Sequence, residues 1–132
     1  MFPFFQTMKE IHEMEIEEPY YSLIKQGYKP VEGRKMSEKW MKLKIWDKLV
    51  ITTPDKTKSF LATITGITYY VPIVSDKNWD PLENYLRGET LARALPHVTT
   101  LERGKEIYLQ WSTAEEIKEM GFMGIQLSVD KF

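Results

Sequence analysis

The chain has 132 residues, of which 42% are hydrophobic and 28% are charged, and its formal net charge is −1. These proportions are typical of a single soluble globular domain and exclude disordered, collagen-like and coiled-coil chains. Cysteine is absent, which excludes disulfide frameworks, zinc ribbons and thiol nucleophiles.

The first half of the chain predicts short strands and helical turns in alternation. Alternating apolar residues predict a strand over residues 10–16. A helix is expected from Glu18–Pro19 to Gln26, because proline commonly starts helices and Gly27 lies just beyond the end. Further along we expect an extended segment, a helical turn and a strand, over residues 29–35, 37–41 and 45–52. In the last of these, Ile45, Leu49 and Ile51 are expected on one face.

The second half begins with a long strand over residues 59–71, which are rich in β-branched and aromatic side chains. Its apolar alternation changes phase at Gly66, which predicts a β-bulge that turns both halves toward one core, with Phe60, Ala62 and Ile64 before it and Ile67, Tyr69 and Val71 after it. Four short helices are expected next, with starts near Asp80, Glu89, Thr99 or Thr100, and Ser112. Ser112 and Glu115 are expected to form a capping box, and Trp111 to pack. A final strand is expected over residues 123–130.

Strands at both ends of the chain, with a long hairpin between them, predict an α+β fold. We expect a mixed sheet of about five to six strands that closes toward a barrel, with several short helices outside it. The apolar runs are shorter than the roughly 20 residues that span a bilayer. Residues 1–5 are apolar but lack the flanking features of a signal peptide. We therefore expect no membrane partner and an intracellular, cytoplasmic location, with the nucleus as the alternative.

Two histidines, His12 and His97, lie far apart in the sequence and have no metal-ligand spacing. No metal site and no cofactor are predicted. His12 alternates with the apolar Met14 and Ile16, which predicts a partly buried histidine with a hydrogen-bond partner.

Positive charge is concentrated in the middle of the chain. Residues 25–58 carry a net charge of +6, whereas residues 1–24 carry −4 and residues 59–132 carry −3. A local positive potential attracts phosphate even when the whole protein is nearly neutral. The middle segment is either a nucleic-acid-binding surface or a solvated lysine-rich surface, and the sequence leaves both open.

The segment from Gly27 to Arg34 carries the most specific charge pattern. Alternate residues of an extended segment share a face, so Glu32 and Arg34 point together, and Lys29 joins them only if the chain turns near Pro30. A carboxylate between two cations is held ionised and oriented, and the remaining donors of the cations are then able to meet a phosphate or a base edge. The alternative is a salt bridge that only fixes the helix–strand junction.

The pattern G-x-K-x-x-E-x-R, over Gly27, Lys29, Glu32 and Arg34, resembles the signature of the ASCH (activating signal cointegrator homology) domain family. Flanking segments resemble the family's first helix, its next strand and its last strand, over residues 18–24, 40–50 and 121–125. The usual Gly-Asp before the third strand is Trp46–Asp47 here. The resemblance covers residues 8–130 of a single domain, 1–132. It implies a PUA-like β-barrel whose cleft is lined by Lys29, Glu32 and Arg34, and binding of RNA or another nucleic acid.

Further residues are candidates for the same interface. Lys35, Lys42 and Lys44 are expected to follow a nucleic-acid backbone. The candidates for stacking on bases are Tyr20, Trp40, Tyr69 and Tyr70, and each stacked base is worth roughly 1–3 kcal/mol. The alternative for these aromatic residues is burial in the core.

A small hydrolase acting on a modified nucleoside or on RNA is the alternative function. Some relatives within the family that this chain resembles are small amidohydrolases that deacetylate a modified cytidine. The resemblance implies a threonine nucleophile where this chain has Glu32 and an activating lysine at Lys29. Glu32 does not replace an activated hydroxyl without a change of mechanism. The enzyme hypothesis therefore uses Lys29 and Glu32 as an acid/base pair, and a protein-interaction domain is a third possibility.

Overall fold

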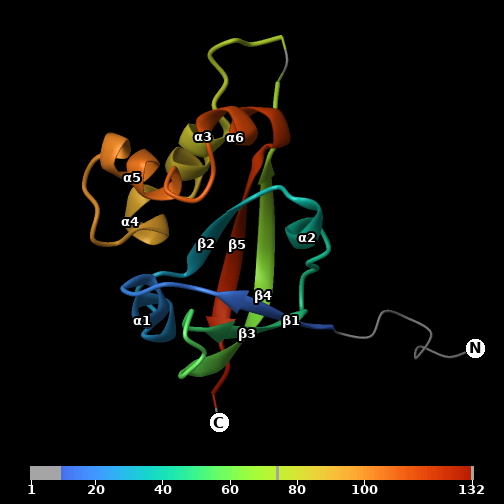
Figure 1. Cartoon of the computed structure of the whole chain (residues 1–132), viewed down its shortest axis with the longest axis vertical. Coiled ribbons are helices and arrows are strands. Elements are labelled where there is room, and N and C mark those ends of the chain that lie inside the picture. Colours follow the sequence, from blue (N-terminus) through green and yellow to red (C-terminus); the bar gives the residue numbers. More distant parts are fainter. Residues whose placement is uncertain (1–9, 74, 132) are drawn as a thin grey trace, which may run out of the picture.

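The structure, a computed structural model, describes residues 10–73 and 75–131. Within these residues, five strands form one sheet in the order β1-β3-β4-β5-β2 (Figure 1). Strand β1 (Ile11–Glu15) runs parallel to β3 (Lys48–Thr52), and the other neighbouring strands are antiparallel: β4 (Ser59–Tyr70), β5 (Phe122–Val129) and β2 (Val31–Lys35). The sheet curls so that β1 and β3 cross the lower halves of β4 and β5 (Figure 1). This half-barrel with several helices confirms the predicted α+β, PUA-like fold.

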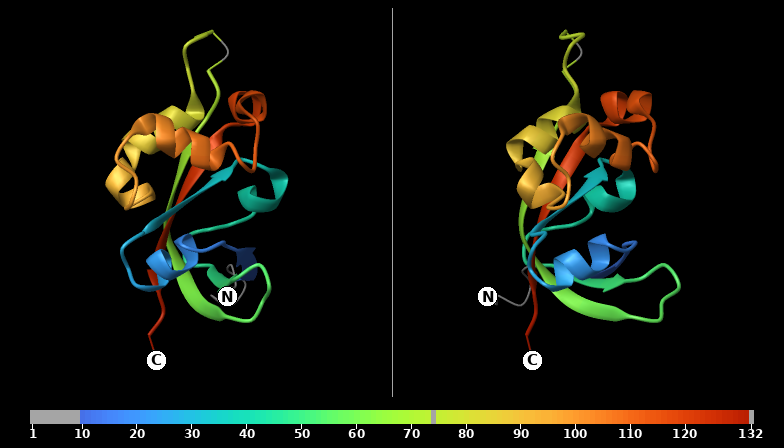
Figure 2. Two further views of the ribbon diagram at one scale, coloured as in Figure 1. Left: turned by 60° about the vertical axis from the view of Figure 1, so that its left-hand side comes forward. Right: turned by 90° about the vertical axis from the view of Figure 1, so that its left-hand side faces the viewer.

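In the described part of the chain, six short helices accompany the sheet: α1 (Tyr20–Lys25), α2 (Glu38–Met41), α3 (Pro81–Gly88), α4 (Leu91–Ala94), α5 (Leu101–Tyr108) and α6 (Ala114–Met120). Helices α3 to α6 gather at the end of the molecule away from β1 and β3, as the two views of Figure 2 show. Asp80 and Thr100 cap α3 and α5 with their side chains, as their positions before apolar periodic segments predicted.

Two hydrophobic clusters form the core. The first fills the curl of the sheet with side chains such as Met14, Ile24, Leu49, Ile64 and Ile125. The second lies between the other face of β2 and β5 and the helices, and includes Val31, Tyr85, Leu86, Ile107 and Phe122. The sheet is therefore buried on both faces near β2 and β5, which is where the motif residues lie.

A pair of glycines lets α3 approach the sheet. Gly33 of β2 and Gly124 of β5 are directly opposite each other in the antiparallel ladder. A Cβ atom on Gly33 would lie 2.6 Å from the Tyr85 and Phe122 rings, and one on Gly124 would lie 3.2 Å from the Tyr85 ring. Tyr85 thus occupies space that any side chain at Gly33 would take.

The bulge predicted at Gly66 is present, since the β4–β5 register shifts between Ile64 and Gly66. The prediction that Tyr69 and Val71 face the core is wrong, because their exposed fractions are 44% and 49%. Strand β3 pairs with β4 only as far as Thr63, so no strand of the described residues lies beside this end of β4 on the β3 side.

Three further expectations need correction. Ile45 is exposed in the connection before β3, because β3 begins only at Lys48. The capping box of α6 is formed by Thr113 and Glu116, one residue later than Ser112 and Glu115. Trp111 does not pack in the core but is about half exposed, for the reason that α5 ends at Tyr108 and the chain turns before α6.

Candidate functional site

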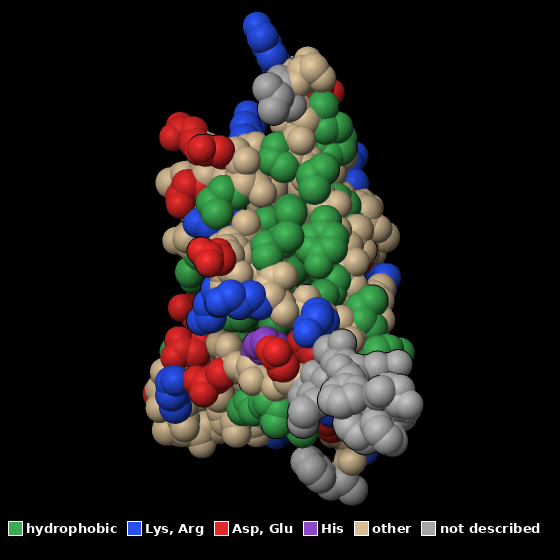
Figure 3. Space-filling model, turned by 90° about the vertical axis from the view of Figure 1, so that its right-hand side faces the viewer, with side chains coloured by type: hydrophobic (Ala, Val, Ile, Leu, Met, Phe, Trp, Pro, Cys, Tyr) green, Lys and Arg blue, Asp and Glu red, His purple; other side chains and the backbone are tan. Residues whose placement is uncertain are grey.

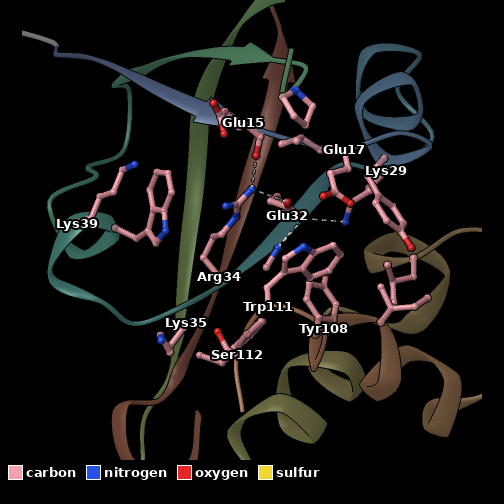
Figure 4. Close-up of a pocket in the computed structure, with 18 of the residues that line it drawn as sticks. Glu15, Glu17, Lys29, Glu32, Arg34, Lys35, Lys39, Tyr108, Trp111 and Ser112 are labelled. Carbon is pink, nitrogen blue, oxygen red and sulfur yellow. Dashed lines mark hydrogen bonds and ion pairs between the residues drawn. The ribbon is translucent and has the colours of Figure 1, made fainter. Parts of the chain in front are cut away.

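A pocket of about 500 Å³ opens on the concave side of the sheet (Figure 4). It extends from β1 and the β3–β4 turn, across β2, to the end of α5. Six of the predicted site residues line it: Tyr20, Lys29, Glu32, Arg34, Lys35 and Trp40. The sequence motif and the pocket therefore coincide.

The turn after α1 brings Lys29 to Glu32. Gly27 has a φ of +87°, in the left-handed region that glycine adopts readily, and the backbone N–H groups of Tyr28 and Lys29 both donate to Leu23 O. The chain then enters β2, and the Lys29 Nζ lies 3.3 Å from the Glu32 Oε1. The condition under which Lys29 joins Glu32, a turn of the chain near Pro30, is met by the turn at Gly27 and the bend at Tyr28.

Lys29 is fully buried, and its ammonium group has three partners. Nζ donates to Val31 O at 2.7 Å, to Ala94 O, and to the Glu32 carboxylate. Burial lowers the pKa of Lys29, and the nearby Glu32 opposes that shift. Because an ammonium has three N–H donors, Lys29 has none left for a ligand. The structure therefore makes Lys29 a residue that positions Glu32.

Glu32 is ionised and held in place by two cations. Its Oε1 also accepts from Gly33 N at 3.0 Å, and its Oε2 accepts from Arg34 Nη2 at 3.1 Å. Burial by itself would raise the pKa of Glu32, but Lys29 and Arg34 outweigh it and the pKa lies below its ordinary value.

Arg34 has N–H donors that no described residue uses. Its Nη2 donates to Glu15 O at 2.9 Å and to Glu32, and its guanidinium lies 5.1 Å from the Trp40 ring centroid. No hydrogen bond from its Nε or Nη1 to another described residue is present. Since Arg34 lines the pocket and its side chain is 24% exposed, these donors are available to a ligand. Figure 4 shows Glu32 and Arg34 on the same side of β2, as strand alternation predicted.

Residues from the α5–α6 region complete the pocket and were not predicted as site residues. They are Tyr108, Trp111 and Ser112 (Figure 4). The Tyr108 hydroxyl lies 2.9 Å from that of the buried Tyr85, which ties it to α3. Trp111 was expected to pack, and only its exposure beside a pocket distinguishes it from a core residue. That exposure follows from the end of α5 at Tyr108, which the helical spacing of apolar residues does not contain.

The pocket carries charges of both signs, rather than the uniformly basic lining that the middle segment suggested. Five cationic side chains line it, together with four glutamates. Lys35 pairs with Glu116 at 2.9 Å, and Lys56 pairs with Glu13 and Glu15. The hydrogen bond from Lys35 lowers the pKa of Glu116 to about 2.

Three predicted interface residues lie outside the pocket lining. Lys42 and Lys44 are exposed in the connection between α2 and β3, and Tyr69 is on the uncovered end of β4. The backbone N–H of Lys44 donates to the Asp47 carboxylate. Any contact of these three side chains with a ligand in the pocket would need a ligand that extends well beyond it.

A second polar cluster lies where β1 and β3 begin. His12 is half-buried, and its Nε2 lies 3.0 Å from the buried Asp47 carboxylate. This confirms the prediction that His12 is a partly buried histidine with a hydrogen-bond partner. The same carboxylate accepts from Glu10 N at 3.2 Å. Glu10, His12 and Asp47 each place a potential ligand atom within 4.8 Å of the others. Their hydrogen bonds join the starts of two parallel strands, which gives the cluster a structural role.

Comparisons with known proteins rest on structure. Neither a protein-family model nor a curated protein matches the sequence. The chain is similar to the crystal structure of the hypothetical protein PH0355, with 27% identity, a TM-score of 0.76, and coverage of 91% of this chain and 99% of that one. It is also similar to the solution structure of protein PF0455 from Pyrococcus furiosus, with 24% identity, a TM-score of 0.68, and coverage of 92% of this chain and 99% of that one.

Structures of ASCH domains are also similar. The ASCH domain from Lactobacillus crispatus shares 14% identity and a TM-score of 0.57, over 91% of this chain and 79% of that one. A variant of ZmASCH from Zymomonas mobilis has 13% identity and a TM-score of 0.57, over 88% of this chain and 66% of that one. The chain therefore has the fold of ASCH domains, a curled mixed sheet with helices, as its motif predicted.

Among the described residues, no helix has the length and apolar character needed to cross a membrane.

Proposed function

We propose that this protein is an ASCH-family module that binds single-stranded nucleic acid, RNA in preference to DNA, and that its pocket receives one or two nucleotides. The observation that carries the proposal is the state of Arg34. One edge of its guanidinium is fixed by Glu32 and by Glu15 O, and Lys29 fixes Glu32 in turn. An arginine held in this way presents its other N–H groups in a rigid fork, which suits a phosphate or a base edge.

Trp111 supplies a face for a base, because it is about half exposed, whereas the cations of Arg34 and Lys39 already lie over the Trp40 ring. Tyr20 and Trp40 line the pocket from α1 and α2, and Trp111 lines it from the α5–α6 region. Unstacked bases of single-stranded RNA bind proteins by stacking on such faces, with hydrogen bonds to their exposed edges. A duplex would keep its bases stacked and away from this pocket.

The mixed charge of the lining sets the expected salt dependence. A continuous basic track would neutralise many phosphates, whereas here most of the lysines at the pocket have carboxylate partners. If two or three phosphates are neutralised, the slope of log K against log salt is roughly −1.4 to −2.1 for a single strand. Most of the affinity would then come from base and sugar contacts.

The hydrolase alternative is weaker on this geometry. A general base works best with a pKa near the working pH, whereas Lys29 and Arg34 keep the pKa of Glu32 below its ordinary value. Turnover of an acetylated cytidine, or cleavage of RNA that is lost in Glu32→Gln, would favour the hydrolase.

The binding proposal is tested by titrating short single-stranded RNA and DNA of the same sequence into the protein at several salt concentrations. Trp111→Ala removes an aromatic face and is expected to weaken binding by roughly 5- to 150-fold, which corresponds to about 1–3 kcal/mol. Arg34→Lys keeps the charge but loses the planar fork, and is expected to weaken binding about tenfold or more.

The matched control is Tyr28→Ala, because Tyr28 is an exposed aromatic residue outside the pocket lining. It is expected to leave affinity unchanged. Absence of RNA binding by the unmodified protein contradicts the proposal, as does an equal loss in the Tyr28 and Trp111 variants.

A further inference from the structure

Strand β4 continues well beyond the end of its neighbour β3. The ladder between them stops at the pair Lys48 and Thr63, whereas the ladder with β5 continues to Tyr70. Since β4 lies between β3 and β5 in the sheet, its last residues have a strand on one side only. Residues 66–70 therefore form an open sheet edge in the described part of the chain.

The hydrogen-bonding pattern identifies which backbone groups face this open side. Ile64 N donates to Asp47 O, and Ile64 O accepts from Trp46 N, so Ile64 faces the β3 side. After the bulge, Gly66 pairs with Gln126, and the alternation of a strand then directs Ile67 and Tyr69 away from β5. Their N–H and C=O groups make no backbone hydrogen bond with any described residue outside the ladders. Two donors and two acceptors thus alternate along this edge.

The edge lacks the features that usually keep sheet edges apart. Natural edges are protected by charged residues, prolines or short strands. Here no residue from 59 to 75 is charged, and most of them favour β structure. Tyr69, Val71 and Trp46 are all exposed. Figure 3, which views the side of the molecule on which α2 lies, shows hydrophobic side chains gathered in a band along it.

We infer that this edge pairs with the same edge of a second copy of the chain, antiparallel, about a two-fold axis at Thr68. In that register Ile67 lies opposite Tyr69 of the partner subunit, and the two residues exchange both of their N–H···O bonds. The symmetry repeats the exchange, so all four open donors and acceptors on each copy are satisfied. Like-with-like pairing of this kind is the usual geometry of a two-fold dimer.

The ends of the open edge fit this register. At one end, Trp46 and Asp47 occupy the place of a neighbouring strand beside Ile64. At the other end, Pro72 has no N–H to continue a ladder. The window from residue 65 to 71 is centred on Thr68, and in it Val71 of the partner subunit lies opposite residue 65, next to the exposed Trp46. Pairing therefore covers the apolar side chains that the monomer leaves in water.

A single cysteine tests both the contact and its register. The chain has no cysteine, so Thr68→Cys creates the only thiol. In the proposed dimer, residue 68 of one copy faces residue 68 of the other across the axis. The two form a non-hydrogen-bonded pair with Cα atoms about 4.5 Å apart, within the range that a disulfide needs. We expect mild oxidation to convert most of this variant to a covalent dimer. Ser128→Cys, at an exposed position of β5, is the matched control and is expected to stay uncrosslinked.

Charge provides the second test, by light scattering on a size-exclusion column. Tyr69→Lys and Tyr69→Glu each place like charges on diagonal neighbours across the axis and are expected to be monomers. An equal mixture of the two is expected to recover the mass of the unmodified dimer. The inference is overturned if the unmodified protein is a monomer at every concentration, if Thr68→Cys crosslinks no faster than Ser128→Cys, or if both charged variants remain dimers.

Discussion

Replacing Lys29 by methionine, which has a similar length and no charge, is expected to be the most damaging single change at the pocket. The substitution removes the donor from two buried carbonyl groups, Val31 O and Ala94 O, and one of the two cations from Glu32. An unsatisfied buried acceptor costs about 1–3 kcal/mol, and breaking a buried ion pair costs about 3–5 kcal/mol. These costs overlap, because Glu32 keeps Arg34 and Gly33 N. We expect a loss of about 4 kcal/mol, a large part of the stability of a small domain.

Urea unfolding followed by tryptophan fluorescence measures this loss. With a dependence of about 2 kcal/mol per molar urea, the midpoint is expected to fall by about 2 M. The control is Lys56→Met, because Lys56 also lines the pocket but is exposed in its pairs with Glu13 and Glu15, and we expect it to move the midpoint little. Glu32→Gln should cost about 1–3 kcal/mol less when Lys29→Met is already present. Equal midpoints for the two lysine variants would refute the argument that Lys29 is a buried, fully bonded cation.

Three further outcomes are expected. Because Lys29 and Arg34 lower the pKa of Glu32 in the folded state, its contribution to stability is complete above the ordinary value of 4.5 and is lost as the pH falls through the folded-state pKa. Unfolding free energy measured against pH should therefore fall less steeply below about pH 5 in Glu32→Gln. An NMR titration should give Glu116 a pKa of about 2, and Lys35→Ala should raise it. Gly33→Ala should destabilise the protein by about 1–3 kcal/mol in urea unfolding, since its Cβ would lie 2.6 Å from the Tyr85 ring.

Local patterns in the sequence were sufficient for much of the fold and for half of the site. The phase change at Gly66 identified a bulge, and the alternation within residues 31–35 put Glu32 and Arg34 on one face. Gly27 marked the end of α1 and the turn that brings Lys29 back. Each of these features depends on residues within a few positions of one another, where backbone preferences decide the outcome.

The remaining parts of the site depend on contacts between distant segments. Arg34 bonds to a carbonyl of β1, and Lys35 bonds to Glu116, which is 81 positions away. Composition placed ten basic residues in the middle of the chain, but it did not show that glutamates from β1 would neutralise part of their charge. The error for Trp111 has a different cause, since a helical spacing does not reveal where a helix stops.

The hydrogen bond from Arg34 to Glu15 O links ligand binding in the pocket to the stability of the sheet margins. Strands β1 and β2 are the two outermost strands of the sheet, so this hydrogen bond fastens together the margins of the open barrel. The Arg34 side chain that is offered to a ligand is thus also the group that joins β1 to β2. Occupying it should slow hydrogen exchange in the amides of both margins, even though they lie at opposite ends of the strand order.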